Sequence, residues 1–289
     1  MISRFILAIC ALLSSCAPHV VPPAPGVATY FVGQPYQIDG AWQYPREFAS
    51  YDVTGVGIVI ERPTDSYTIN NELYEPHDLV AASPVLPLPS IVTVTNLVNG
   101  YSMQVRVNER GPNIPGRVIA VSPHVAQLLG FPPDGVVEVR VQLDSQASAQ
   151  VQNALGAGPK LTAAPVAGIT AQSLAPLGSA QGNGAVQQLI ATDKTGNQTN
   201  GPQLSGQVSI TNPAPGPLWV RISGFGSPSG AYPTQARLYG MPTKIVPVFG
   251  GSRTLFAIEA GPYRSVAAAD AALQQVLAHG INGPEIVVR

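Results

Sequence analysis

Charged side chains are scarce in this sequence. Lys and Arg number 15 and Asp and Glu 16, together 11% of 289 residues, against roughly 25% in an average soluble protein. The net charge is −1. Because nucleic-acid binding needs clustered basic residues, the sequence argues against a nucleic-acid partner. Fully disordered chains combine low hydrophobicity with high net charge, whereas hydrophobic residues here make up 45% of the chain, so we expect folded domains.

Cysteine is nearly absent, and both copies, Cys10 and Cys16, lie in the first sixteen residues. There Arg4 precedes a short apolar run, which is typical of a signal peptide covering residues 1–15 and too short for a membrane span. Residues 13–16 (LSSC) resemble a bacterial lipobox, which implies that the Cys16 thiol is acylated. Ala17 follows, so we expect a lipid anchor in the outer membrane of a Gram-negative bacterium, with the chain facing the periplasm. The alternative is an ordinary signal peptide that happens to contain cysteine.

The mature chain would therefore have no disulfide, no thiol nucleophile and no zinc site built on cysteine. Four histidines are scattered through the sequence without the spacing of metal ligands: His19, His77, His124 and His279. We expect neither a metal nor a cofactor.

Composition divides the mature chain into four parts. Residues 16–29 are a Pro-rich tether, 30–143 a folded domain, 144–216 a flexible linker and 217–289 a second folded unit. The predicted linker has no aromatic residue after position 144 and only three charged ones between 145 and 216. Such a segment buries too little apolar surface to offset the entropy of ordering.

The first folded region reads as β-rich. Two apolar runs, residues 91–97 and 101–107, flank Asn99-Gly100, a dipeptide that predicts a hairpin with a type I′ turn. Ser122-Pro123 predicts the start of a short helix that ends before Gly130. The alternation of residues 137–141 (VEVRV) predicts a half-buried strand.

The residue pattern of the second folded unit predicts the order βαββαβ, which is that of a ferredoxin-like α+β domain. Ser265 is the expected N-cap of its second helix, and Gly280 follows the end of that helix. We expect its strands and helices at residues 218–222, 234–239, 244–249, 254–260, 266–279 and 286–288.

Several motifs of the first region stand in one order and spacing: residues 71–74 (NELY), 86–90 (LPLPS), 94–100 (VTNLVNG), 106–112 (RVNERGP) and 116–119 (GRVI). This ordered set resembles the rare lipoprotein A family of septal lytic transglycosylases, whose catalytic domain is a six-stranded double-psi β-barrel. The C-terminal unit resembles a SPOR domain, through Phe225 at a strand end and Gly261-Pro262-Tyr263.

The resemblance implies an endolytic lyase that cuts peptidoglycan glycan strands lacking stem peptides and leaves 1,6-anhydromuramyl ends. The nucleophile is the muramyl C6 hydroxyl of the substrate, so one carboxyl group can act first as acid and then as base. The SPOR-like unit would bind the same strands and enrich the protein at the division septum. Divisome proteins are further possible partners, and a monomer is expected.

The catalytic positions of the family are only partly kept. The family's glutamate corresponds to Glu72, its aspartate to Glu109, its histidine to Ser83, and a further aspartate to Ala120. Glutamate for aspartate moves the acid by roughly 1 Å, a displacement that can cost on the order of 10²-fold in rate. The resemblance therefore implies Glu109 as acid and base assisted by Glu72, with a catalytically weakened or purely glycan-binding, tethering lipoprotein as the alternative.

Other side chains are candidates for substrate contact. In the barrel these are Asn108, Arg110, Arg117, Ser83 and Tyr74, and in the SPOR-like unit Arg221, Phe225 and Tyr263. Amide and guanidinium groups hydrogen-bond sugar hydroxyls, and aromatic rings stack on sugar faces. Each could instead serve packing or loop conformation. An expansin-like wall-loosening protein, which shares the barrel, is a third interpretation.

Overall fold

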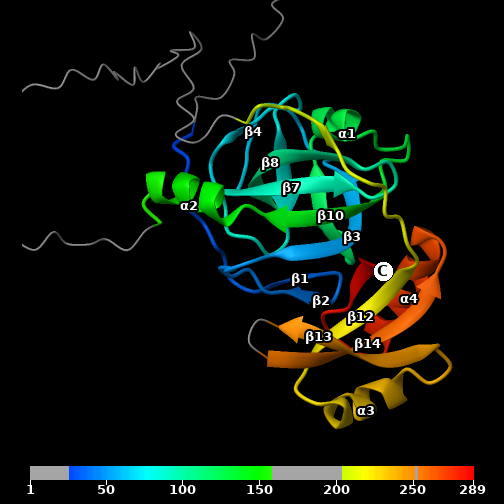
Figure 1. Cartoon of the computed structure of the whole chain (residues 1–289). Coiled ribbons are helices and arrows are strands. Elements are labelled where there is room, and N and C mark those ends of the chain that lie inside the picture. The colour runs from blue at the N-terminus through cyan, green and yellow to red at the C-terminus, as the bar shows by residue number, and fades with distance from the viewer. Residues whose placement is uncertain (1–25, 158–203, 251–252) are drawn as a thin grey trace, which may run out of the picture.

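A computed structural model of the chain describes residues 26–157, 204–250 and 253–289. They form a β-barrel and a C-terminal α+β unit beside it (Figure 1). The predicted signal peptide, Cys16, residues 17–25 of the tether and residues 158–203 of the predicted linker lie outside the described residues. Among the described residues, no helix is both long and apolar enough to cross a membrane.

The barrel is closed by six strands, as predicted. They follow one another around it in the order β8-β6-β9-β3-β10-β7, and β7 pairs again with β8. The β3–β9 and β6–β8 pairs are parallel and the others antiparallel, which is consistent with a double-psi barrel. The strands are β3 (Asp52–Val59), β6 (Val80–Ser83), β7 (Ser90–Asn96), β8 (Tyr101–Arg110), β9 (Arg117–Val121) and β10 (Val137–Leu143).

Alternation along the strands fills the barrel. In β10 the valines at 137, 139 and 141 are buried, whereas Arg140 between them is exposed. β6 is buried along its whole length and pairs with a strand on each side. Each fully buried aliphatic side chain contributes roughly 1.5–3 kcal/mol, so this interior is the main source of stability for the barrel.

The turn between β7 and β8 differs from the prediction. Gly100 has a φ of 79°, but Asn99 is not among the residues with positive φ, so a type I′ turn is excluded. The connection spans residues 97–100, and the amide of Gly100 donates to the Asn96 carbonyl at 2.8 Å. Asn96 and Asn99 instead donate their side-chain amides to the Leu129 carbonyl, which fixes the turn against the end of helix α1 (Pro123–Leu128).

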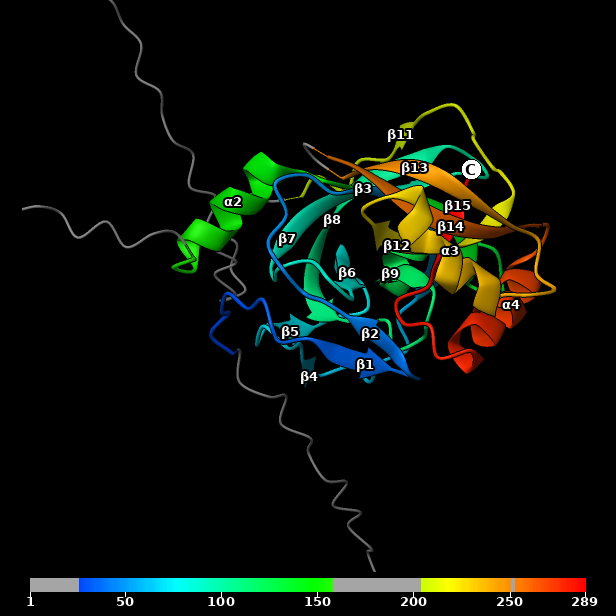
Figure 2. The same cartoon turned by 90° about the horizontal axis from the view of Figure 1, so that it is seen from below.

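Helix α1 confirms its predicted cap. The Ser122 hydroxyl accepts a hydrogen bond from the Val125 amide, and Gly130 beyond the helix has a φ of 64°. Two small antiparallel pairs accompany the barrel, and Figure 2 shows them gathered on one side of it. They consist of β1 (Tyr36–Ile38) with β2 (Ala41–Gln43), and β4 (Ser66–Tyr67) with β5 (Leu73–Tyr74).

Both ends of the predicted linker are ordered, so its boundaries are wrong. Helix α2 (Ser145–Ala154) begins at the Asp144 cap and docks on β7, where the Ser148 hydroxyl exchanges hydrogen bonds with the backbone of Ile91. Strand β11 (Ser209–Ile210) adds to the edge of β8. Part of the predicted tether also packs: Thr29 donates its amide to the Asn70 carbonyl at 2.8 Å.

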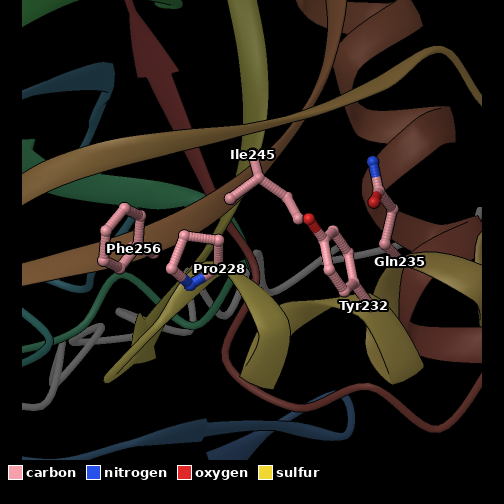
Figure 3. Close-up of a pocket in the computed structure, with 5 residues that line it drawn as sticks. All are labelled: Pro228, Tyr232, Gln235, Ile245 and Phe256. Atoms are coloured by element: carbon pink, nitrogen blue, oxygen red, sulfur yellow. The ribbon is translucent and has the colours of Figure 1, made fainter.

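The C-terminal unit has the predicted βαββαβ order and a four-stranded antiparallel sheet in the order β13-β14-β12-β15. Helices α3 and α4 pack on one face of the sheet (Figures 1 and 2). A pocket of about 350 Å³ opens between α3 and the sheet (Figure 3). The elements are β12 (Leu218–Phe225), α3 (Pro228–Arg237), β13 (Thr243–Gly250), β14 (Arg253–Tyr263), α4 (Val266–Ala278) and β15 (Glu285–Val288).

The two units share an interface. Thr54 of β3 donates its hydroxyl to the Val288 carbonyl of β15 at 2.7 Å and accepts the Val288 amide. Val56 of the barrel is fully buried within the hydrophobic core of the C-terminal unit. Gly55 allows this close approach, since a Cβ there would lie 2.8 Å from the Ile286 carbonyl oxygen.

Candidate active site

A cleft of about 500 Å³ opens on the barrel at the ends of several strands. Its walls come from residues 58–62 at and beyond the end of β3, from the end of β8 and the loop that follows it, and from residues 134–136 before β10. Ala82 of β6 and Ala120 of β9 also line it. The cleft is therefore built by segments far apart in sequence that the barrel topology brings together.

Glu109, at the end of β8, is the predicted acid that lines this cleft. Its side chain is only 12% exposed. Oε1 accepts hydrogen bonds from the backbone amides of Arg110 at 2.7 Å and Ile69 at 3.3 Å. Oε2 is buried without a hydrogen bond, and its partner is the Arg62 guanidinium, with which it forms an ion pair. The carboxylate is thus held by the backbone on one oxygen and by a cation on the other.

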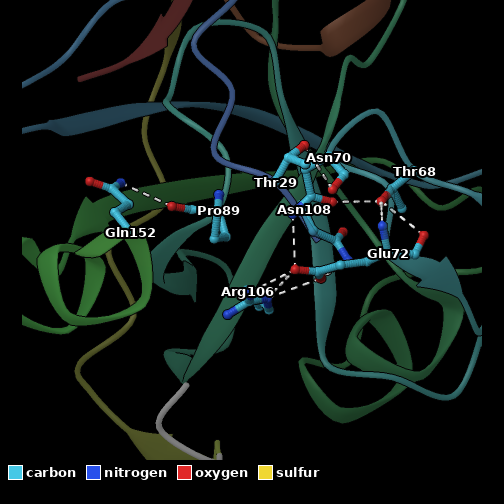
Figure 4. A network of polar contacts seen from close by, with 8 residues as sticks. All are labelled: Thr29, Thr68, Asn70, Glu72, Pro89, Arg106, Asn108 and Gln152. Carbon is cyan, nitrogen blue, oxygen red and sulfur yellow. Dashed lines mark hydrogen bonds and ion pairs between the residues drawn. The ribbon is translucent and has the colours of Figure 1, made fainter. Parts of the chain in front are cut away.

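Glu72 lies in a different environment, shown in Figure 4. Arg106 donates to its carboxylate through Nε at 3.0–3.1 Å and through Nη2 at 2.6 Å. Asn108 and Asn70 each add one hydrogen bond at 2.9 Å. Burial alone would raise the pKa of Glu72, but these donors outweigh it and hold the pKa below its ordinary value. Glu72 is therefore a carboxylate at neutral pH and cannot serve there as a proton donor.

The structure does not bring Glu72 and Glu109 together in the cleft. Glu72 is not among the residues that line it, and its oxygens are engaged by Arg106 and the two amides. The two carboxylates are linked only through neighbouring residues. Asn108 donates to Glu72 and precedes Glu109 in β8, and the adjacent Ile69 and Asn70 donate to Glu109 and Glu72. Glu72 therefore does not assist Glu109 from within the cleft.

Arg110 lines the cleft, but its guanidinium is committed to backbone carbonyls. It donates to the carbonyl oxygens of Ser83 at 2.9 Å, Leu86 at 2.8 Å and Val32 at 2.7 Å. Asn108 is 2% exposed, so its amide stabilises Glu72 and does not face a ligand. Both residues therefore hold the walls of the site in place.

Three predicted substrate contacts lie away from the cleft. Tyr74 is 2% exposed and belongs to the core, and Ser83 is 1% exposed. The Ser83 hydroxyl accepts from the amides of Val85 and Leu86, so it caps a turn where the family has histidine. Arg117 forms a bidentate ion pair with Asp270 of α4 at 2.6 and 2.8 Å, because its side chain points to the C-terminal unit.

The three predicted glycan contacts of the C-terminal unit do not share one face. Burial alternates along β12 and places Arg221 opposite the core residues Leu218 and Val220. A register shift then turns Phe225 towards the core side, and Phe225 and Tyr263 both pack against that core. Arg221 instead pairs with Glu259, a fully buried carboxylate that Lys244 and Arg289 also contact.

Two arginines of the site were missed by sequence reasoning. The position of Arg106 could have been predicted from the sequence. It lies two residues before Asn108 in β8, and the two-residue period of a strand places both side chains on one face. The position of Arg62 could not, because its contact with Glu109 joins segments that lie 47 residues apart in the sequence.

Comparisons with known proteins bear on this site. Residues 61–141, which include most of the cleft, match the family described as lytic transglycolase. Over 241 residues the chain is 30% identical to the endolytic peptidoglycan transglycosylase RlpA of Pseudomonas aeruginosa, covering 80% of this chain and 69% of that protein. It is 35% identical over 117 residues to RlpA of Rickettsia bellii and 31% over 198 residues to RlpA of Yersinia pestis. The Rickettsia bellii match covers 39% of this chain and 52% of that protein. The Yersinia pestis match covers 64% of this chain and 54% of that protein.

Proposed function

The chain belongs to the RlpA family of endolytic peptidoglycan transglycosylases, and on that premise we propose that its barrel cleaves peptidoglycan glycan strands with Glu109 as the acid. The observation that carries the proposal is the position of Glu109, which is the one predicted acid that lines the 500 Å³ cleft. Its low exposure suits proton transfer away from bulk water.

The reaction needs only one carboxyl group. Protonated Glu109 gives its proton to the glycosidic oxygen as the bond from muramyl C1 to the 4-oxygen of the next N-acetylglucosamine breaks. The muramyl C6 hydroxyl then forms a bond to C1, and its proton passes to the Glu109 carboxylate. The products are a 1,6-anhydromuramyl end and a free 4-hydroxyl, and Glu109 is protonated again. Glu72 acts through Arg106 and Asn108 as a positioning residue for β8.

Further parts of the proposal concern where the enzyme acts. We place it in the periplasm, anchored to the outer membrane through acylated Cys16, and acting on strands without stem peptides at the division septum. The C-terminal unit is proposed as a SPOR-like glycan-binding domain. We locate its glycan contact on the sheet face of Arg221, where Lys244 lies 3.7 Å from the centre of the Trp219 ring, because a cationic and aromatic face suits a carboxylate-bearing sugar.

The test is incubation of the full chain with sacculi stripped of stem peptides, followed by mass spectrometry of the soluble products. We expect anhydromuramyl ends from the wild type, and about 10²- to 10⁴-fold fewer from Glu109→Gln, because that variant has no acid to donate. Asp52→Asn, which removes an exposed carboxylate from the barrel surface, is the matched control and keeps full activity. Equal product from Glu109→Gln and the wild type would reject the mechanism.

A catalytically weakened tethering lipoprotein is the second candidate. The buried Ser83 hydroxyl favours it, because that position supplies no titratable group to the cleft. Ala120, where the family has aspartate, also lines the cleft without a polar side chain. The same incubation separates the candidates: a tethering protein pellets with the sacculi and releases no anhydromuramyl product.

A further inference from the structure

Arg62 stands out among the residues that line the cleft. It is one of two cations there, and the other, Arg110, is committed to three backbone carbonyls. Arg62 is 24% exposed, so a ligand in the cleft can reach its guanidinium. Its Nε donates to the Ser66 hydroxyl at 2.7 Å, and Nη2 donates to the Tyr67 carbonyl. The remaining Nη1 faces Glu109.

The acidic residues around the cleft restrict where an anionic ligand could lie. Glu61, Glu109 and Asp134 all line it, so three carboxylates face two guanidinium groups. A ligand carboxylate would be repelled from most of the cleft and accepted only beside Arg62. Because Nε and Nη2 are held by Ser66 and Tyr67, the guanidinium is fixed in place and offers a ligand carboxylate the charge-assisted donor Nη1.

The substrate offers such a carboxylate only in one chemical form. Muramyl residues carry a lactyl group that ends in an amide bond when a stem peptide is attached, and in a free carboxylate when the peptide has been removed. We propose that Arg62 is a specificity-determining residue that recognises the free lactyl carboxylate of the muramyl residue in the cleft. This inference rests on the proposed function, since it names the form of glycan that the same site selects.

Exchange of partners at Arg62 would couple recognition to chemistry. In the structure Nη1 of Arg62 neutralises Oε2 of Glu109, which is buried and has no other partner among the described residues. When the lactyl carboxylate takes that place, Oε2 is left in the cleft without a counter-ion. Loss of the counter-ion and the approach of a second carboxylate both favour the protonated form of Glu109, which is the form that can act as the acid.

The direct test is nuclear magnetic resonance of the full chain. The Nε–H signal of Arg62 is assigned by its disappearance in the Arg62→Gln variant and, independently, in Arg62→Lys. If one variant fails to fold, the other still provides the assignment. The probe is a soluble tetrasaccharide of alternating N-acetylglucosamine and muramyl residues with free lactyl carboxylates. We expect it to shift the Arg62 signal, and we expect the same tetrasaccharide with its lactyl groups converted to amides to leave the signal in place. Equal shifts with both probes, or none with either, would overturn the inference.

Turnover gives a second readout. For the wild type we expect kcat/KM to be about tenfold or more higher on free strands than on amidated strands, the effect of one charge-assisted hydrogen-bond pair. Arg62→Gln should bring this ratio close to one, whereas a purely structural role would lower both rates and keep the ratio.

Arg140→Gln, which breaks an exposed ion pair on the barrel surface, is the matched control and keeps the ratio. If the wild type yields no product while the Arg62 signal still responds, the proposed function fails and the inference stands.

Discussion

The two predicted catalytic glutamates, Glu72 and Glu109, differ in how fully their carboxylate oxygens are engaged. The Glu72 carboxylate meets four donor groups from Arg106, Asn108 and Asn70, whereas Glu109 is met by two backbone amides and Arg62. Full engagement of Glu72 makes it a fixed anion that supports β8. Oε2 of Glu109 has the Arg62 guanidinium as its only partner within the described residues. A difference of this kind assigns separate roles to the two groups.

Glu72→Gln should lower the free energy of unfolding at pH 7 by about 2–3 kcal/mol, because it leaves the mostly buried Arg106 guanidinium without its counter-ion. The folded-state pKa of Glu72 is lowered from 4.5, so its contribution is present above pH 4.5 and is lost as pH falls through the lowered value. Urea unfolding at pH 7 and again well below pH 4.5 should therefore show a gap between wild type and variant that closes in acid. A gap that persists unchanged in acid would contradict the assignment.

Sequence reasoning identified the residues of the motifs but not the direction of each side chain. Glu109 and Arg110 both line the cleft, because they are the last two residues of β8. Tyr74, Ser83 and Arg117 were expected there too, and the structure buries the first two and turns the third to Asp270. Side-chain direction depends on bulges and register shifts, such as that between Ala81 and Ala82 of β6, which leave no mark in a single sequence.

At the scale of elements, low hydrophobicity was a poor guide to disorder in residues 145–157 and 204–216. Helix α2 is mostly polar, yet it buries Ser148 and Val151 against the barrel. The order comes from hydrogen bonds to existing barrel strands: α2 is fixed through Ile91 and β11 through Tyr101 and Ser102. A segment that is ordered by hydrogen bonds to a neighbouring strand needs little hydrophobic core of its own. Its order therefore cannot be predicted from composition alone. The strand and helix order of the C-terminal unit, by contrast, followed from its apolar pattern and caps.

Ser148→Ala tests how α2 is held. The Ser148 hydroxyl accepts the Ile91 amide at 2.8 Å and donates to the Ile91 carbonyl at 3.1 Å, both in a buried setting. Its loss takes this partner from the buried Ile91 amide, whereas the Ile91 carbonyl keeps the hydrogen bond from the Asp144 amide at 2.9 Å. We therefore expect stability to fall by about 1–2 kcal/mol. Hydrogen exchange should also quicken in residues 145–154. Gln150→Ala, at an exposed position of the same helix, should change neither. Unaltered exchange in Ser148→Ala would show that other contacts hold the helix.

At the scale of the whole molecule, the barrel and the C-terminal unit meet through more than a chain connection. Val56 and Leu97 of the barrel are buried in the core of the C-terminal unit. The Gly216 amide donates to Glu138 of β10 at 3.1 Å. A shared core and matched polar pairs distinguish this arrangement from two domains joined only by a linker. The cleft and the cationic sheet face are consequently held in one relative orientation.

Asp270→Asn tests whether the two units behave as one cooperative body. Arg117 is 8% exposed and its bidentate partner is Asp270, so the variant leaves a buried guanidinium with a neutral partner across the interface. We expect this to cost about 2 kcal/mol. The wild type should unfold in a single calorimetric transition, because separating the units would expose the shared core to water. In Asp270→Asn the transition should broaden or divide, with the C-terminal unit melting first.

Gln274→Ala, on the exposed side of the same helix, should keep the single transition. Two transitions in the wild type would mean that the interface contributes too little for the units to unfold together, and that the fixed orientation of cleft and sheet face does not persist in solution.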